Sequence, residues 1–301
     1  MKKMKKVTRI EVEELIALGS ELNFQNADLS NLDLSNLDLS GANFNDAEMS
    51  FTELNGAILN RANLEGAILE GANMEGAKLC WAQLGGADLK GANLKGADLL
   101  AANLKGAYLK KVNLEGANLD GAELERAYME GINLKGVKLD KANLKGAYLY
   151  GADLVGTNLE GANMEKAVLF FAELSGTILV GANLKGANLG RTLGDANLKD
   201  ANLENAHLGG AELYGANLNG ANLTSARLQG TILEGANLAG VNLQGANLEN
   251  AYLGGAELQN ANFKNANLKG TRFTTLNFEG INLEGTNLNE VIYIKEEELL
   301  E

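Results

Sequence analysis

The sequence predicts an all-β solenoid, in which short extended segments wind into stacked coils. Three observations predict it: an apolar residue recurs at every fifth position, a small residue stands two positions before it, and glycine stands two positions after it. A period of five fits neither the 3.6-residue turn of an α-helix nor the strict alternation of a single strand. It fits an extended segment and a turn that follow each other along the chain.

The register of this repeat predicts which side chains face inward. It begins at Phe24, runs without a break to Leu189, takes one step of four residues to Leu193, and continues to Leu288. The recurring apolar residue, here called the centre, is mostly Leu, and Ala most often stands two positions before it. We expect these two side chains to point inward. The residue between them and the two residues after the centre should point outward.

The residue two positions after each centre predicts the turn. Gly is most frequent there, and Asn replaces it in several repeats: Asn26, Asn31, Asn205, Asn250 and Asn260. A type II turn needs a positive φ at its second central residue. Gly tolerates this conformation best, and Asn tolerates it second best. The chain has no Pro, which fits a fold in which every coil donates backbone N–H groups to its neighbour.

Tandem units such as Ala62-Asn63-Leu64-Glu65-Gly66 resemble the pentapeptide repeat family, whose motif is Ala-(Asp/Asn)-Leu-x-Gly. The resemblance covers residues 22 to about 293. It implies a right-handed quadrilateral parallel β-helix with four pentapeptides per coil, and therefore about 13 coils here. We expect a basic N-terminus and capping helix over 1–21, the repeat β-helix over 22–293, and an acidic C-terminal tail over 294–301.

The step of four residues interrupts an otherwise regular register. We expect the missing residue to be absorbed at a corner, with the apolar column of the interior continuous across it. Arg191 stands where Ala is expected. Its side chain should point outward or lie along the corner, because a buried, unpaired guanidinium is too costly.

The segment before the repeats predicts a capping helix over residues 8–18. Thr8 and Glu11 have the spacing of a capping box, and Val7 and Val12 have that of a hydrophobic staple. A helix in this place would cover the open edge of the first coil, which otherwise invites polymerisation.

The opposite end predicts a weaker seal. Its apolar residues are Phe273, Phe278, Val291, Ile292, Tyr293 and Ile294. Only a short acidic tail follows them, too short for an autonomous helix. We therefore expect any homodimer to form through the C-terminal coils, since a symmetric contact buries both ends. Repulsion between the glutamates of two tails would oppose it.

Residues four repeats apart should lie on one face, and this spacing predicts polar ladders. Lys and Glu alternate on two faces, at Lys105, Glu125, Lys145, Glu165, Lys185 and Glu204, and at Glu75, Lys95, Glu115 and Lys135. Asn recurs before the centre at Asn63, Asn103, Asn143, Asn163, Asn183, Asn202 and Asn222. Opposite charges on adjacent rungs attract, and amide ladders are structural.

Composition excludes several functions. A formal net charge of −13 argues against broad nucleic-acid binding, and one Cys with one His cannot form a zinc cage. The spacing puts Cys80 and His207 on different faces and several coils apart, so they cannot form a catalytic dyad. We expect Cys80 to be a bystander and His207 a surface residue next to Arg227. An interior filled by Leu and Ala leaves no concave site, so we expect no catalytic, cofactor or metal site.

The sequence also lacks the signals of a membrane protein. No stretch approaches ~18 consecutive apolar residues, and no apolar segment follows the basic residues at the N-terminus. We therefore expect a cytoplasmic protein without a membrane partner.

The candidate contact surface is a face on which large apolar residues gather. Its members are Tyr108, Tyr128, Tyr148, Tyr150, Val168, Phe170 and Phe171. Stacked aromatic side chains stabilise neighbouring strands, but an exposed apolar group on a polar surface also marks a contact site. We predict a non-enzymatic intracellular scaffold that presents a rigid β-helical rod to an unidentified protein partner.

The family resemblance implies one alternative function. Some members mimic B-DNA and modulate type II topoisomerases such as gyrase, which gives protection from quinolones. Such mimicry needs a long run of negative charge. Here the excess acid lies in residues 11–60 and 279–301, while residues 61–278 are nearly neutral. The topoisomerase function therefore stands as the second choice.

Overall fold

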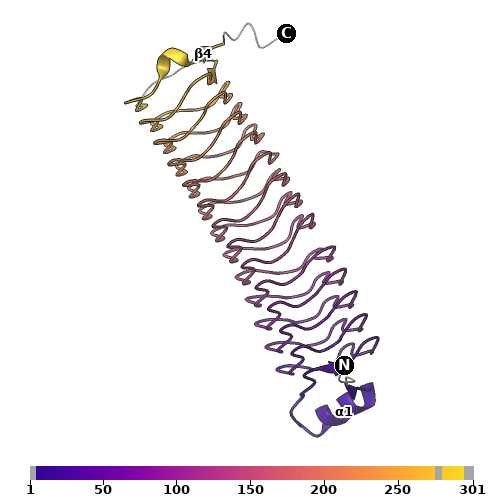
Figure 1. The fold of residues 1–301 in the computed structure, drawn as a ribbon. Coiled ribbons are helices and arrows are strands. Elements are labelled where there is room, and N and C mark those ends of the chain that lie inside the picture. Colours follow the sequence, from indigo (N-terminus) through magenta and orange to yellow (C-terminus); the bar gives the residue numbers. More distant parts are fainter. Residues whose placement is uncertain (1–4, 275–279, 295–301) are drawn as a thin grey trace. The chain divides into compact units, whose positions relative to one another are not determined.

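The structure is a computed structural model of the 301-residue chain, and it describes residues 5–274 and 280–294. The chain divides into two compact units, Met1–Tyr148 and Leu149–Glu301, and each is described by itself. In both units the backbone repeats one bridging residue and one turn in every five residues (Figure 1).

Parallel backbone ladders join the coils within each unit. The residue before a centre pairs with the residue twenty positions further on, as Asn43 does with Asn63 and Asn217 with Asn237. The Asn63 N–H donates to Ala42 on the preceding coil (2.8 Å), while the next N–H, that of Leu64, donates forward to Gln83 (2.6 Å). Four repeats therefore make one coil of a parallel β-helix, as the sequence predicts.

The inward positions are filled as the register predicts. In the unit quoted above, Ala62 and Leu64 are fully buried and Asn63 is only half-buried. Thr replaces Ala at a few of these positions, and its hydroxyl finds a backbone acceptor, as when Thr177 Oγ1 donates to Leu154 O (2.8 Å). The interior is therefore apolar, and these hydroxyls are satisfied in it.

The turns have the predicted geometry. The N–H of Ala27 donates to Phe24 O (3.0 Å) across the turn, and Asn26 between them has a φ of 56°. The other four predicted Asn residues also have positive φ, at 58° or 59°. Large residues adopt the same conformation, among them Phe51 at 56° and Trp81 at 57°. Their strain, roughly 1–2 kcal/mol for a residue with a Cβ, is tolerated because both neighbouring coils fix the backbone.

The prediction that Leu193 is a centre is wrong. Its side chain is 42% exposed, and its backbone lies in the ladder between Glu173 and Glu212. Thr192 is the buried residue in the position of Ala, so Gly194 takes the position of the centre. In this short unit only Asp195 stands between the centre position, Gly194, and the next inward residue, Ala196, where a regular repeat has two residues. The column of inward leucines lacks one side chain at Gly194.

The backbone closes the gap at this corner. A Cβ on Gly194 would lie only 2.7 Å from the Cα of Ser175, so the site accepts no side chain. The Gly176 N–H has no backbone carbonyl opposite it and instead donates to Asp195 Oδ1 (2.8 Å). Arg191 is exposed, as predicted, but it takes the turn position with a φ of 53°, where the sequence analysis had placed it at the position of Ala.

At the N-terminal end of the first unit, a strand and a helix precede the coils (Figure 1). Strand β1 (Lys5–Lys6) pairs in parallel with β2 (Ala27–Asp28). Helix α1 (Arg9–Ala17) begins at Thr8 with a complete capping box, and Val12 is buried. Arg9 Nη1 lies 3.0 Å from Asp33 Oδ1, which ties the helix to the coils.

At the C-terminal end of the second unit, strand β3 (Arg272–Phe273) pairs in parallel with β4 (Ile292–Tyr293). The 3₁₀-helix η1 (Leu288–Glu290) leads into β4. Phe273 is buried, Val291 and Ile294 are half-buried, and Ile292 and Tyr293 are exposed. The predicted Phe278 and the acidic residues 295–301 lie outside the described residues.

Candidate functional site

A tyrosine ladder lies on one face of the first unit. Tyr108, Tyr128 and Tyr148 occupy successive rungs of one backbone ladder. Their ring centroids are 4.7 and 5.0 Å apart, and the ring planes differ by 2° and 8°. The three rings are stacked and exposed. Each contact contributes on the order of 0.5–1.5 kcal/mol beyond burial, so the ladder stabilises the coils that carry it.

A second aromatic group, here called the aromatic cluster, lies in the second unit and consists of Tyr150, Phe170 and Phe171. The Phe170 and Phe171 centroids are 4.5 Å apart at an angle of 69°, and Tyr150 lies 6.1 and 5.9 Å from them. Tyr150 is 49% and Phe171 46% exposed. The rings of the tyrosine ladder are nearly parallel, whereas those of the aromatic cluster lie at different angles to one another. The cluster therefore exposes both ring faces and ring edges to solvent.

The local backbone sets these ring orientations. Phe171 occupies a turn position with a φ of 62°, which turns its ring away from the direction of Phe170. The Phe170 ring lies over Gly190, where a Cβ would come within 2.8 Å of Phe170 Cδ2. Gly190 thus gives this ring the space to lie flat on the coil.

Arg191 adds a positive charge to the aromatic cluster. Its Cζ lies 5.8 Å from the centroid of the Phe171 ring, within the range of a cation–π contact. Our sequence analysis missed this contact, although a signal was present. Arg191 stands twenty residues after Phe171, which is the spacing that predicts the other ladders. The same spacing links Arg61 to Trp81, with 5.7 Å between Cζ and the ring centroid.

The structure brings together part of the predicted contact surface. It unites Tyr150, Phe170 and Phe171, and it stacks the three tyrosines of the ladder. Val168 is half-buried and pairs through its backbone with Asn188. Tyr148 ends the first unit and Tyr150 belongs to the second. A single surface joining all seven residues therefore stays a prediction.

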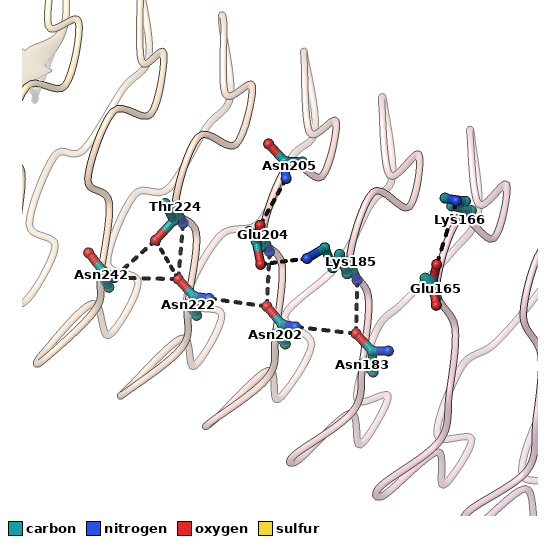
Figure 2. A network of polar contacts seen from close by, with 10 residues as sticks. All are labelled: Glu165, Lys166, Asn183, Lys185, Asn202, Glu204, Asn205, Asn222, Thr224 and Asn242. Atoms are coloured by element: carbon teal, nitrogen blue, oxygen red, sulfur yellow. Dashed lines mark hydrogen bonds and ion pairs between the residues drawn. The ribbon is translucent and has the colours of Figure 1, made fainter.

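The predicted polar ladders are present where Figure 2 views the second unit. Amide groups link Asn183, Asn202 and Asn222 at 3.3 and 3.2 Å, and Lys185 Nζ lies 2.9 Å from Glu204. Lys95 and Glu115 pair as predicted, at 3.1 Å. These pairs are exposed, so each is worth only about 0–1 kcal/mol.

One predicted charge pair is replaced by another. Lys105 Nζ lies 3.3 Å from Glu123, whereas among the described residues no carboxylate oxygen of the predicted Glu125 lies within 4.0 Å of it. Glu123 precedes the centre Leu124 and Glu125 follows it, so both carboxylates lie on the same coil. The charge of Lys105 is therefore still paired, but with the other carboxylate of that coil.

Cys80 and His207 lie in surroundings that do not activate them. Cys80 Sγ donates to Asp98 Oδ2 (3.3 Å), and burial, together with this carboxylate, raises the pKa of the thiol. The thiol is thereby kept in its protonated, weakly nucleophilic form. His207 is exposed and pairs with Arg227 in the backbone ladder; burial of its ring and then the charge of Arg227 lower the pKa of the imidazole.

Residues 5–274 and 280–294 contain neither a cluster of metal-ligating side chains nor a membrane-spanning helix. In that part of the chain no three His, Cys, Asp or Glu side chains converge so that they could hold a metal ion. Within the same residues, no helix has the length and apolar character needed to cross a membrane.

Several solved structures are similar to this chain. HetL of the cyanobacterium Nostoc, a pentapeptide repeat protein involved in the regulation of heterocyst differentiation, is 29% identical over 95% of this chain and 97% of its own, with a TM-score of 0.21. Rfr23 of the cyanobacterium Cyanothece is 31% identical over 47% of this chain and 91% of its own, with a TM-score of 0.25. QnrB1, a plasmid-mediated fluoroquinolone resistance protein, is 18% identical over 77% of this chain and 91% of its own, with a TM-score of 0.36.

No functionally curated protein matches the sequence. The family model of pentapeptide repeats matches it in eight copies, over residues 23–61, 57–96, 97–136, 127–165, 167–192, 196–235 and 236–274. These segments include nearly all the coils described above. With its five-residue register, buried centres and positive-φ turns, the chain belongs to the pentapeptide repeat family.

Proposed function

We propose that this protein is a non-enzymatic scaffold of the cytoplasm that binds a protein partner through the aromatic cluster. One observation carries the proposal: Tyr150 and Phe171 hold large apolar rings in solvent, on coils whose other outward side chains are mostly polar. An exposed apolar group of this kind is typical of a contact site. Tyr is also enriched in the centres of interfaces.

The interior supports a non-enzymatic role. Leu and Ala side chains fill it, and among residues 5–274 and 280–294 the only polar side chains buried in it are threonines. The raised pKa of the Cys80 thiol disfavours a cysteine nucleophile. We infer that binding, and no covalent chemistry, is what the coils provide.

A pull-down from lysate of the native host tests the proposal. The bait variant combines Tyr150→Ser with Phe171→Gly, since Gly is the residue that the turn position favours. Tyr214→Ser is the matched control, because Tyr214 is a similarly exposed tyrosine (45%) in the same unit. We expect a protein that the wild type and the control retain and the double variant loses. Identical proteins on all three baits would contradict the proposal.

We also propose that the two ends of the chain differ in how they are closed. Helix α1 and strand β1 would cap the first coil of a right-handed helix of about 13 coils. At the other end, Tyr293 on β4 is 58% exposed, and no strand among the described residues pairs with the outer edge of β4. Self-association through these C-terminal coils would bury that edge.

Sedimentation of the wild type and of Tyr293→Arg tests the C-terminal contact. Arg keeps a long side chain on β4, but in a symmetric contact the charges of the two arginines would repel each other. We expect a dimer for the wild type and a monomer for the variant at the same concentration. A wild type that is monomeric at all concentrations would exclude this contact.

A further inference from the structure

The coils that carry the aromatic cluster have an unusual charge. Their outward face, here called the basic face, comprises residues 149–151, 167–171, 187–191, 206–210 and 226–230. It contains no Asp or Glu, although acidic residues outnumber Lys and Arg by 39 to 26 in the whole chain. It does contain Arg191, His207 and Arg227. Within these residues every charged group is therefore positive, and the first carboxylate on the same face is Glu249 on the coil after them.

The two arginines of the basic face are not neutralised. Among residues 5–274 and 280–294, neither Arg191 nor Arg227 has a carboxylate within 4.0 Å. Some other cations of the unit do have one: Lys185 lies 2.9 Å from Glu204, and Lys264 lies 2.8 Å from Glu284. Arg191 instead rests on the Phe171 ring. Both guanidinium groups are exposed and keep their hydrogen-bond donors available.

Charge and apolar surface meet at Arg191. The exposed Phe171 ring lies against the guanidinium group of Arg191. Leu193, two residues further along the chain, is also exposed, because the four-residue unit turns it outward. Leu193 is outward only because Gly194 takes the position of the centre. The irregular unit thus exposes an aliphatic side chain two residues from Arg191, between Glu173 and Glu212 on the neighbouring backbone ladder.

The side chains of the basic face also change from large to small along the coils. The residue that directly follows the centre is Tyr150 and then Phe170 on two successive coils, and it is Gly190 and Gly209 on the next two. Phe170 covers Gly190, but a Cβ on Gly209 would meet only Gln229 O, at 3.7 Å. Beyond the rings the backbone is therefore open, with His207 and Arg227 beside it on the neighbouring ladder.

We propose that the basic face binds an extended acidic segment of the protein partner, with an apolar side chain of that segment against Phe171 and its carboxylates on Arg191 and Arg227. Arg suits this role because its planar guanidinium accepts a carboxylate through two parallel hydrogen bonds. The inference rests on the proposed scaffold function and adds the chemistry of the partner. The occupant is a segment of another protein; a second copy of this chain, whose residues 11–60 hold ten acids and no Lys or Arg, is an outcome that the test must separate.

Selection from a random dodecapeptide phage library on the full-length chain tests the chemistry. We expect the selected peptides to be enriched in Asp and Glu and to share at least one large apolar residue. The same selection on Arg191→Glu should lose this enrichment. Peptides without acidic enrichment, no selected peptides at all, or equal enrichment on both proteins would overturn the inference.

Affinities of one selected peptide locate the site. Arg191→Glu and Arg227→Glu should each weaken binding by about tenfold or more, and binding should weaken as salt is raised. The matched control is Lys199→Glu, an exposed cation of the same unit that makes no ion pair in the described part of the chain. An equal loss in all three variants would mean that only the net charge matters, and the site would be wrong. Circular dichroism spectra of the three variants that match the wild-type spectrum would show that the loss of binding is not due to misfolding.

Two further outcomes separate the inference from the function on which it rests. If the pull-down partner depends on Tyr150 and Phe171 but the selected peptides are not acidic, the scaffold function stands and this inference fails. If the pull-down shows no such dependence, the scaffold function fails. A dimer of the wild type that Arg191→Glu dissociates would identify the acidic occupant as a second copy, and would overturn the assignment to another protein.

Discussion

At the scale of single residues, the turn glycines serve two separate purposes. All of them accept a positive φ, but some also make room for the turn residue of the preceding coil. A Cβ on Gly71 would lie 2.5 Å from Cε1 of Phe51, and one on Gly56 would lie 2.6 Å from Asn36 Oδ1. A Cβ on Gly131 would meet no atom within 4 Å. The turn residues Phe51 and Asn36 are therefore each followed, on the next coil, by a glycine that leaves room for their side chains.

This difference predicts unequal effects of two Gly→Ala substitutions. Gly71→Ala and Gly131→Ala both place a Cβ at positive φ, which costs roughly 1 kcal/mol. Gly71→Ala must in addition displace the Phe51 ring, so its urea midpoint should be lower than that of Gly131→Ala. The double variant Phe51→Gly with Gly71→Ala should recover most of the difference, because Gly at position 51 has no side chain to displace. Equal midpoints for the two single variants would show that only φ matters.

His207 predicts a pH dependence of stability. Burial of its ring and the charge of Arg227 lower the pKa of the folded state, so the unfolded chain takes up the proton first. The contribution to stability is therefore complete above the unfolded pKa of about 6.5 and is lost as the pH falls through the lower, folded value. Asn at this position cannot titrate and would extend the amide ladder from Asn188.

Urea unfolding of the wild type and of His207→Asn, at neutral pH and at mildly acidic pH, measures this contribution. We expect the free energy of unfolding to fall less on acidification in the variant than in the wild type. An identical fall would assign the pH dependence to carboxylates instead.

At the scale of structural elements, side chains replace backbone carbonyls wherever the coils are irregular. Asp195 Oδ1 accepts from Gly176 N–H (2.8 Å) at the four-residue unit. Near the end of the described coils, Thr274 Oγ1 accepts from Gly255 N–H and Asn287 Oδ1 from Leu268 N–H, both at 2.7 Å. The ladder therefore continues across these irregularities, although the chain does not supply its usual acceptor.

The four-residue unit predicts a clear difference between two variants of Asp195. Asp195→Ala leaves the Gly176 N–H without an acceptor and should destabilise the chain by about 0.5–1.5 kcal/mol in urea unfolding. Asp195→Asn keeps a carbonyl oxygen at the same place and should lose less. If both variants unfold like the wild type, water replaces the carboxylate at no cost.

Most of this element could be predicted from the sequence, but its register could not. The repeat spacing located the missing residue to within a few positions and placed Arg191 outward. It assigned Leu193 to the interior because Leu is the usual centre, and it gave Gly194 no role because Gly is the usual turn residue. Only the backbone decides between them: the corner must move inward toward Ser175, and a position that close accepts no side chain.

The contact surface shows a similar limit. Sequence spacing found the tyrosine ladder, since each rung needs only the twenty-residue register. It did not find Arg191 against Phe171, because the register assigned Arg191 to the position of Ala, whereas its φ of 53° places it in the turn stack of Phe171. The angles within the aromatic cluster also depend on the φ of Phe171 and on the space above Gly190, which no residue pattern encodes.

At the scale of the whole molecule, the distribution of charge favours the scaffold function over the topoisomerase function. Lys95 with Glu115, Lys264 with Glu284, and the other pairs neutralise carboxylates along the coils. The excess of acids lies in residues 11–60 and 279–301, and in the first of these Asp28, Asp33 and Asp38 accept hydrogen bonds from the serine hydroxyls two residues on. Neither arrangement repeats the even spacing of phosphates along DNA.

We therefore expect the protein to leave gyrase unaffected. In a supercoiling assay the purified chain should neither inhibit the enzyme nor protect it from a quinolone, up to a large molar excess. QnrB1 serves as the positive control for protection. Protection by this chain that Arg191→Glu leaves unchanged would favour the topoisomerase function and place it away from the basic face.

The twenty-residue reach of the backbone ladders has a consequence for how the chain is made. Each coil donates hydrogen bonds only to its two neighbours, so a coil needs nothing that is synthesised much later than itself. At about 5–20 residues per second, a ribosome delivers one coil every ~1–4 seconds, whereas two adjacent strands pair within about 1–10 microseconds. The nascent protein can therefore fold from β1 and α1 onward at the pace of translation, with only its newest coil exposed to wrong partners at any moment.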